Sequence, residues 1–307
     1  MSPLRLRRSE LATPASSERM IQSAARGEAD LVFLDLEDAV APAQKDSARS
    51  NAIEALKGLD WGTKTRAVRI NDVSTPWAHQ DVIDVVLEAG DALDVLIVPK
   101  VRGPRDIWWV ETLLDQLEAR ARRGRPVALE VLIEEAEGLA TVEALASSSQ
   151  RLETLIVGFG DLSASLGMKV GAVAGHSTYP GDVWHYARAR VLTAARAAGI
   201  EAIDGPFPNF RDPDGYREEC RRAGALGFSG KWAIHPSQLP IANEVFTPTE
   251  EEVEGARRVI EAYRNAEEFG AGAAGMAGSL IDAAALRIMD AVIQKAELIE
   301  RTSSASA

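Results

Sequence analysis

Two carboxylates, Glu134 and Asp161, follow short apolar runs with the character of buried strands. The runs, Leu129 to Ile133 and Leu155 to Val157, break off into acidic or glycine-rich residues, as buried parallel strands do at their carboxyl ends. If these strands are neighbours, joined by a helix around Ala136 to Ala146, the carboxylates face each other across one pocket mouth. Two such groups repel, so they need a shared proton or a hard divalent cation such as Mg²⁺. The alternative, that both residues merely begin or cap helices, fits the spacing equally well.

These carboxylates belong to a longer alternation of short apolar segments and amphipathic helical segments, which is typical of a parallel α/β protein. The expected strands are Ser9 to Ala12, Leu31 to Leu36, Arg66 to Ile70, Val95 to Val98, Leu129 to Ile133, Leu155 to Val157, Ala202 to Asp204 and Lys231 to Ile234. Eight such units predict a (β/α)₈ TIM barrel rather than an open sheet. An open doubly wound sheet more often carries a G-x-G-x-x-G turn after its first strand, and the sequence has none there.

In such a barrel the active site lies at the carboxyl ends of the strands, so the residues that follow each strand are the candidates. They form a polar set: Thr13, Asp35, Glu37, Asp38, Arg69, Asn71, Lys100, Glu134, Asp161, Asp204 and His235. Each has a structural alternative, since Glu37 and Asp38 can begin a helix and Arg69 and Lys100 can pair with acidic neighbours. The number of charges that converge on one end of the barrel favours a functional site.

The composition of the chain excludes several classes of protein. The chain has 307 residues, 46% of them hydrophobic, and a net charge of −12 that argues against binding to nucleic acid or acidic lipid. A single cysteine, Cys220, excludes an intramolecular disulfide and fits a reducing compartment. No apolar run has the length of a membrane span, and the first residues lack the apolar stretch of a signal peptide. We therefore expect a cytoplasmic protein.

The character of the chain changes past Pro240, which predicts a barrel domain over residues 1–245 and a helical extension over 246–307. Thr249 begins a charged helix that runs to about Glu268. Gly270 to Ser279 reads as a flexible glycine-alanine hinge, and the helix after it presents an apolar face. A helix on such a hinge can cover its own barrel or reach a neighbouring subunit.

Many ordered motifs resemble those of one known family. They include RSELATPASSERM, LVFLDLEDAVAP, AVRIND, LIVPKV, LEVLIEEAEGL, IVGFGDL, IDGPFPNF, GKWAIHPSQ and GSLID. Together they resemble the HpcH/HpaI aldolase and citrate lyase β-subunit family of CoA-ester lyases, with the greatest likeness to its malyl-CoA/β-methylmalyl-CoA lyase branch. The likeness runs from about Arg8 to Ile299, nearly the whole chain.

The resemblance implies a Mg²⁺-dependent barrel, with Mn²⁺ as an alternative ion, that assembles as a homotrimer or hexamer. Such enzymes cleave a 3-hydroxyacyl-CoA, for example (S)-malyl-CoA to acetyl-CoA and glyoxylate or a related 2-oxo acid. By position, Glu134 and Asp161 match metal ligands, and Arg69 matches the arginine that holds the thioester or enolate oxygen. Glu37 and Asp38 match carboxylates that bond to metal waters and to that arginine. Asp282 matches an acid delivered by the C-terminal segment of an adjacent subunit.

The substrate contacts are carried over in the same way. Basic side chains expected around the mouth for CoA are Arg8, Arg19, Lys45 and Lys100, with Pro236 near the adenine end. Backbone N–H groups from Gly160 to Leu162 are expected to hold the glyoxylate carboxylate. Two departures bear on the acyl group: Glu135 replaces a small hydroxyl residue, and the passage from Ser163 to Asp182 is shorter than in malyl-CoA lyases.

Other functions remain open at the level of sequence. The same site fits a malyl-CoA thioesterase, if water reaches the thioester. It also fits a pyruvate-type aldolase that acts without CoA. A barrel that binds CoA esters without turning them over is disfavoured by the presence of Glu134, Asp161, Arg69 and Asp282 together.

Overall fold

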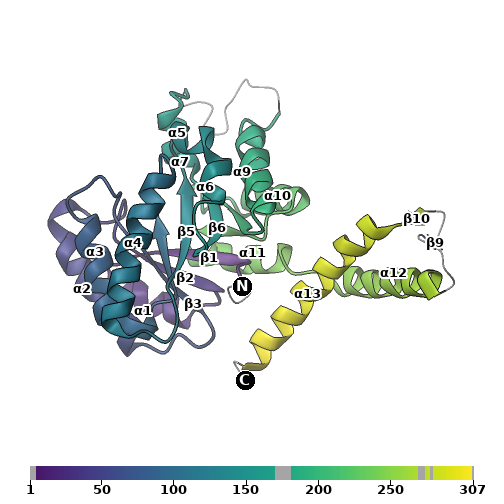
Figure 1. The fold of residues 1–307 in the computed structure, drawn as a ribbon, viewed down its shortest axis with the longest axis horizontal. Helices are drawn as coiled ribbons and strands as arrows, with labels where there is room; N and C mark the ends of the chain where they lie inside the picture. Colours follow the sequence, from purple (N-terminus) through teal and green to yellow (C-terminus); the bar gives the residue numbers. More distant parts are fainter. Residues whose placement is uncertain (1–4, 170–180, 269–273, 277–278, 306–307) are drawn as a thin grey trace.

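The structure is a computed structural model that describes residues 5–169, 181–268, 274–276 and 279–305. Within these residues, eight parallel strands close into one barrel in the order β1-β2-β3-β4-β5-β6-β7-β8 (Figure 1). The strands are β1 (Ser9–Pro14), β2 (Leu31–Asp35), β3 (Thr65–Arg69), β4 (Val95–Val98), β5 (Ala128–Ile133), β6 (Leu152–Val157), β7 (Glu201–Asp204) and β8 (Gly230–Ala233). The expected TIM barrel is thereby confirmed, and all eight strand predictions overlap the observed strands.

Helices between the strands cover the outside of the barrel (Figure 1). They are α1 (Glu18–Arg26), α2 (Lys45–Gly58), α3 (Ala78–Ala89), α4 (Pro104–Ala121), α5 (Ala136–Ala140), α6 (Val142–Ala146), α7 (Phe159–Ser165), α9 (His185–Ala197), α10 (Pro213–Leu226) and α11 (Leu239–Val245), with short 3₁₀ turns at Pro42–Gln44, Gly90–Ala92 and Pro236–Gln238. The single helix expected from Ala136 to Ala146 is divided at Thr141. Residues 170–180, within the passage expected to border the acyl pocket, lie outside the described part.

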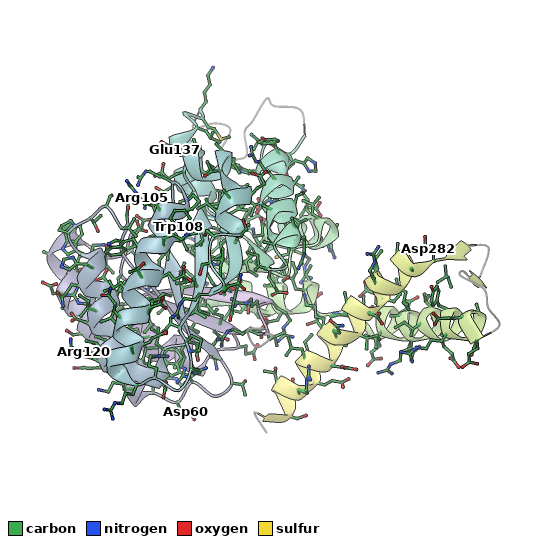
Figure 2. All side chains as sticks on the ribbon, in the orientation of Figure 1. Asp60, Arg105, Trp108, Arg120, Glu137 and Asp282 are labelled. Atoms are coloured by element: carbon green, nitrogen blue, oxygen red, sulfur yellow. The ribbon has the colours of Figure 1, made fainter. Side chains whose placement is uncertain are left out.

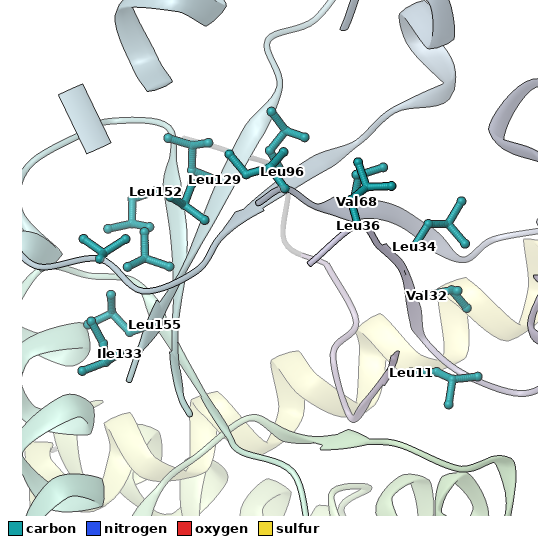
Figure 3. Packing of buried hydrophobic residues seen from close by; sticks show 14 of the residues in the cluster. Leu11, Val32, Leu34, Leu36, Val68, Leu96, Leu129, Ile133, Leu152 and Leu155 are labelled. Carbon is teal, nitrogen blue, oxygen red and sulfur yellow. The ribbon is translucent and has the colours of Figure 1, made fainter. Parts of the chain in front are cut away.

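Side chains alternate between the two faces of the barrel wall, as the period of two along a strand requires. In β2, Leu31 and Phe33 point into the barrel, where they pack with Trp232 of β8. Val32 and Leu34 point outward into a larger cluster between the strands and the helices, part of which is drawn in Figure 3. Each fully buried leucine in that cluster contributes about 2 kcal/mol of transfer free energy. The barrel interior is therefore a packed core, and its carboxyl end is a platform for the residues that follow the strands.

The C-terminal segment leaves the barrel as an arm (Figure 1). It consists of α12 (Glu250–Glu268), β9 (Ala274–Met276), β10 (Ser279–Ile281) and α13 (Ala283–Ala305), with β9 and β10 paired antiparallel. Thr249 caps α12 as expected, because its Oγ1 accepts a 3.2 Å hydrogen bond from the Glu252 N–H. Part of the expected glycine hinge, residues 270–273 and 277–278, lies outside the described residues. Near the middle of α13, Lys295 Nζ donates a 3.0 Å bond to the Ser229 carbonyl of the barrel.

None of the helices in the described part of the chain combines the length and the apolar character that a bilayer crossing requires.

Candidate active site

A cavity of about 410 Å³ opens at the carboxyl ends of the strands. Its lining includes Thr13, Asp35, Asp38, Arg69, Glu134, Gly158, Gly160, Asp161, Trp232 and Ile234. A second hollow, of about 470 Å³, lies between α3 and α4 around the exposed ring of Trp108 on the outside of the barrel (Figure 2). That outer hollow contains none of the polar residues that follow the strands, so the chemistry belongs to the mouth.

Glu134 directly follows β5 and is almost fully buried, with 2% of its surface exposed. The Lys100 N–H donates a 2.9 Å hydrogen bond to its Oε1. Burial raises the pKa of Glu134 to about 8, although Arg69 and Lys100 act in the opposite direction. A cation bound beside this carboxylate would favour its ionised form, which is the requirement of a metal ligand.

Asp161 lies in the first turn of α7, four residues after β6 ends. Because β5 and β6 are hydrogen-bonded neighbours with Ile133 opposite Val157, the expected pairing of the strands that carry the two carboxylates is confirmed. The Asp161 side chain is 40% exposed, and its Oδ2 lies 3.7 Å from Lys100 Nζ. Neither α5 nor α7 has a side-chain cap, which disfavours capping as the role of these carboxylates.

The carboxylates of Glu134 and Asp161 suit Mg²⁺, which keeps several waters, better than an ion whose ligands all come from the protein. Among the described residues, no group of three or more His, Cys, Asp or Glu side chains is placed to enclose a metal. Glu134 and Asp161 would supply oxygen ligands only, which would leave coordination positions for water or for substrate oxygens. Mg²⁺ characteristically binds through one or two carboxylates and keeps several waters.

Arg69 is the last residue of β3, and contacts with two carboxylates and two aromatic rings hold its side chain in one orientation. Its Nε and Nη2 donate to the two Asp35 carboxylate oxygens, each at 2.7 Å, and its Nη1 lies 3.3 Å from Glu37 Oε2. Its guanidinium lies over the rings of Phe33 and Trp232, 5.9 and 5.6 Å from their centroids. Burial alone would lower the pKa of Arg69, but Asp35 more than offsets this and raises it, so the side chain stays cationic.

Glu37, Asp38 and Lys100 form a charged rim beside Arg69. Lys100 Nζ contacts Glu37 Oε1 and lies 2.9 Å from Asp38 Oδ1. Burial raises the pKa of Glu37 to about 7, against the opposing effect of Arg69. Lys100 adopts the left-handed backbone conformation, with φ of 51°, which is uncommon for a residue with a side chain and is found at functional sites. Its ammonium thus lies among the carboxylates, whereas the sequence predicted a contact with CoA.

Two other cations expected around the mouth, Arg8 and Lys45, are bonded within the protein. Arg8 precedes β1 and lies at the amino ends of the strands, opposite the mouth, where its Nη2 is 2.8 Å from Asp30 Oδ1. Lys45 is buried, and its Nζ donates 2.7 Å bonds to the carbonyl oxygens of Leu36 and Glu37. Lys45 therefore fixes the loop that carries Glu37, and its ammonium is not directed at a ligand.

The other predicted substrate residues lie on the mouth side of the barrel. Arg19, in the first turn of α1, and Pro236, just after β8, are both exposed. Gly160 lines the cavity. Leu162 differs, because it is fully buried and its N–H already donates to the Gly158 carbonyl at 3.1 Å, so this N–H does not serve a substrate carboxylate.

Glu135, which stands where the resemblance leads us to expect a small hydroxyl residue, is bonded outside the mouth cavity. Its Oε1 lies 3.3 Å from Arg102 Nη2, and its Oε2 accepts a 2.9 Å bond from Ser165 Oγ. It does not appear in the lining of the mouth cavity.

Asp282 lies on the arm, far from the mouth of its own barrel (Figure 2). Its Oδ1 accepts hydrogen bonds from the N–H groups of Ala284 and Ala285, at 2.9 and 3.0 Å, so it caps α13. These two backbone bonds lower the pKa of the Asp282 carboxyl.

Three residues with clear functions in this geometry were given no role from the sequence: Asp35, Trp232 and Gly158. Asp35 was visible as a polar residue at the end of a strand, but the sequence does not reveal that it pairs with Arg69. Trp232 lies in β8, and no motif in the sequence marks it as a residue of the site. Gly158 precedes Asp161, and a Cβ at this position would lie 2.6 Å from Glu134 Oε2, so glycine makes room for that carboxylate.

Comparisons with known proteins assign the chain to a family. A model of the HpcH/HpaI aldolase/citrate lyase family matches residues 8–236. L-malyl-CoA/beta-methylmalyl-CoA lyase of Cereibacter sphaeroides is 41% identical over 97% of this chain and 96% of that protein. Malyl-CoA/beta-methylmalyl-CoA/citramalyl-CoA lyase of Chloroflexus aurantiacus is 34% identical over 89% of this chain and 82% of that protein. The structure of the protein CitE from Mycobacterium tuberculosis in complex with magnesium, acetoacetate and coenzyme A is 29% identical, with a TM-score of 0.74, and the match covers 94% of this chain and 97% of that one. The chain belongs to the HpcH/HpaI aldolase/citrate lyase family.

Proposed function

We propose that this protein is a Mg²⁺-dependent CoA-ester lyase that cleaves the carbon–carbon bond of a 3-hydroxyacyl-CoA. The substrate proposed is (S)-malyl-CoA, giving acetyl-CoA and glyoxylate, or its β-methylmalyl-CoA and citramalyl-CoA analogues. The observation that carries the proposal is the mouth cavity, where Glu134, Asp161 and Arg69 converge. The names of the relatives from C. sphaeroides and C. aurantiacus support this substrate class, and the magnesium and coenzyme A in the M. tuberculosis structure support the cofactor and the thioester.

In this proposal Glu134 and Asp161 hold Mg²⁺, with Mn²⁺ as an alternative. When bound, the ion supplies Lewis acidity toward the hydroxyl and carboxylate oxygens of the substrate. Glu134 lies at the floor of the site, and Asp161, which is 40% exposed, lies toward solvent. The pair therefore leaves the open side of the site to the substrate.

Arg69 stabilises the charge that develops during cleavage. The substrate hydroxyl passes its proton to a carboxylate at the mouth, the neighbouring carbon–carbon bond breaks, and the electrons of that bond pass into an enolate of the thioester, whose carbon then takes up one proton. A guanidinium fixed by two 2.7 Å bonds to Asp35 can meet the enolate oxygen without reorganising. Glu37 and Lys100 form the rest of this rim, and both side chains are held by ion pairs.

The enolate carbon is protonated by Asp282 of a neighbouring subunit, and for this the pKa of Asp282, which is lowered in the exposed arm, has to rise when the arm closes over the barrel. Asp282 lies far from the mouth of its own barrel (Figure 2), which supports its delivery by a second chain. The proposal therefore includes a homotrimer or hexamer in which residues 246–307 of one chain close the barrel, residues 1–245, of the next. Closure of such a lid excludes water from the enolate and the thioester. A cytoplasmic location belongs to the same proposal and agrees with the single, buried Cys220.

The proposal is tested with purified protein, Mg²⁺ and three substrates in separate reactions: (S)-malyl-CoA, β-methylmalyl-CoA and citramalyl-CoA. The 2-oxo acid, the acyl-CoA product and free CoA are quantified in each. A 2-oxo acid that appears with acetyl-CoA or propionyl-CoA supports the lyase and identifies the acyl group. Free CoA without a 2-oxo acid assigns the site to a thioesterase. Cleavage of a hydroxy acid that lacks CoA, with no turnover of the thioesters, assigns it to an aldolase.

A further inference from the structure

A buried aromatic ring lies next to the proposed metal ligand Asp161. Phe159 is the first residue of α7 and is 7% exposed. Its ring centroid lies 4.9 Å from that of Trp184, with the two planes at 40°. The Arg188 guanidinium carbon lies 4.6 Å from the same centroid, and Lys231 Nζ lies 5.8 Å from it. One ring in the turn that bears Asp161 is thus packed against two cations and a second ring.

The two cations are fixed by a buried carboxylate at the end of β7. Arg188, Lys231 and Asp204, here called the Asp204 cluster, are each fully buried. Arg188 Nε lies 2.8 Å from Asp204 Oδ1, and Lys231 Nζ lies 2.6 Å from Asp204 Oδ2. Lys231 Nζ also donates to the Gly205 carbonyl at 2.6 Å.

Carboxylates at the edge of the cluster complete its partners. Glu219 of α10 lies 3.3 Å from Arg188 and 2.9 Å from Lys231, and Asp182, ahead of α9, lies 2.9 Å from Arg188 Nη1. Charges taken out of water are tolerated only with such hydrogen-bonded partners. The cluster therefore holds the two cations rigidly against the Phe159 ring.

Close backbone packing confines the same turn. A Cβ at Gly205, which follows β7, would collide with the Val157 carbonyl oxygen and lie 2.9 Å from Phe159 Cδ2. On the other side, a Cβ at Gly158 would lie 2.6 Å from Glu134 Oε2. The segment from Gly158 to Asp161 is thus fitted between the Glu134 carboxylate and the Asp204 cluster.

We propose that Phe159 is a positioning residue, which the Asp204 cluster holds so that the turn presents Asp161 to the same ion as Glu134. The inference rests on the metal site proposed above and adds residues that contact neither metal nor substrate. Asp161 itself is 40% exposed, and its ion pair with Lys100 is a distant 3.7 Å. Its position therefore depends on the backbone that carries it, and that backbone is anchored by Phe159. Residues that orient a metal ligand from behind typically change metal affinity by about 10–100-fold when they are replaced.

A purely structural role makes a different prediction from a positioning role. If Phe159 only fills space, its loss lowers the melting temperature of the protein but leaves the metal affinity of the folded protein unchanged. If it positions Asp161, the affinity falls as well. Metal binding without substrate separates the two, because it does not depend on catalysis.

The test compares Phe159→Leu with Phe228→Leu by calorimetric titration of the full-length protein with Mg²⁺ and by thermal unfolding. Phe228 is a matched control, since it is 4% exposed and lies just before β8, at the amino end of the barrel. We expect Phe159→Leu to weaken Mg²⁺ binding about tenfold, while Phe228→Leu lowers the melting temperature without changing the affinity. Phe159→Tyr keeps the ring face and is expected to restore most of the affinity.

Unchanged Mg²⁺ affinity in folded Phe159→Leu would overturn the inference. Should that variant not fold, Arg188→Lys decides, because it keeps the charge beside Asp204 but removes the guanidinium plane from the ring. Binding weakened about threefold or more supports the inference, and wild-type affinity refutes it. Wild-type protein that binds no Mg²⁺, or Glu134→Gln that binds it normally, would overturn the proposed metal site and this inference with it. Loss of binding in Glu134→Gln with normal binding in Phe159→Leu would overturn the inference alone.

Discussion

Gly158 packs so closely against the side chain of Glu134 that a Cβ at residue 158 would lie 2.6 Å from both Cβ and Oε2 of Glu134. We therefore expect Gly158→Ala to displace the carboxylate, to weaken Mg²⁺ binding about tenfold or more and to destabilise the fold by about 1–3 kcal/mol. Calorimetric titration and denaturant unfolding measure the two effects. Gly160→Ala is the matched control for both, since nothing lies within 4 Å of a Cβ at that position. Equal behaviour of the two variants would contradict this account of Gly158.

Asp35→Asn tests the fixation of Arg69. The substitution removes one charge of a buried pair joined by two 2.7 Å bonds, and such a loss costs about 3–5 kcal/mol of stability when the partner remains charged. We expect turnover to fall at least tenfold as well, because an arginine that has lost its fixed orientation stabilises developing charge poorly. Product formation by the folded variant gives the measurement.

The control for Asp35→Asn is Asp94→Asn. Asp94 is buried and pairs with Arg66 at 2.9 Å, at the amino end of the barrel. The Asp94→Asn protein should be less stable than the wild type, but each folded molecule should turn over substrate at the wild-type rate. A comparable loss of turnover in both variants would show that the effect is not specific to Arg69.

Metal affinity should depend on pH through Glu134. Burial raises the pKa of this carboxyl from 4.5 to about 8, so at pH 6 the metal-free folded protein holds a proton that the unfolded chain releases. This group accordingly stabilises the metal-free fold most below pH 4.5, and its contribution is lost as the pH rises through about 8. Because Mg²⁺ must displace the proton, we expect its affinity to rise by up to about tenfold per pH unit between pH 6 and 8 and then to level off.

Titrations with Mg²⁺ across that range, with melting temperatures of the metal-free protein measured in parallel, check the sign of both effects. An affinity that stays constant from pH 6 to 8 would show that Glu134 is already ionised in the metal-free protein.

Asp282→Asn tests the delivery of an acid by the arm. Asparagine is as good a helix cap as aspartate, so the bonds to the Ala284 and Ala285 N–H groups, and with them the start of α13, should persist. We expect Mg²⁺ and CoA binding to stay near wild-type values while turnover falls about 100-fold or more. Asp290→Asn, farther along α13, is the control and should be fully active.

Subunit exchange extends this prediction. Asp282→Asn and Glu134→Gln chains, each inactive alone, should recover part of the activity when mixed, since a mixed assembly contains an intact barrel beside an intact arm. Absence of recovery after demonstrated exchange would favour a site built within one chain.

The sequence predicted the features that depend on periodicity. Buried runs such as Leu31 to Leu36 and Val95 to Val98 were recognisable as strands, and their order along the chain is their order around the barrel. The proximity of Glu134 and Asp161 followed from that order, because consecutive parallel strands lie side by side.

Features that depend on the direction of a side chain were not predictable in this way. Lys45 resembles a ligand-binding cation in the sequence, but it is directed inward to two carbonyl oxygens. Arg8 lies one residue before a strand, at the end opposite the mouth. The contacts of Phe159 join β6, β7, β8 and α9, so no local sequence pattern records them.

The central claim is tested most directly by following (S)-malyl-CoA with the wild-type protein and with Glu134→Gln, each in the presence of Mg²⁺ and of a chelator. The account predicts equimolar glyoxylate and acetyl-CoA from the wild-type protein with Mg²⁺, and a loss of both products with the chelator or in Glu134→Gln. Release of free CoA and malate without glyoxylate, or glyoxylate formation that persists without Mg²⁺, would contradict it.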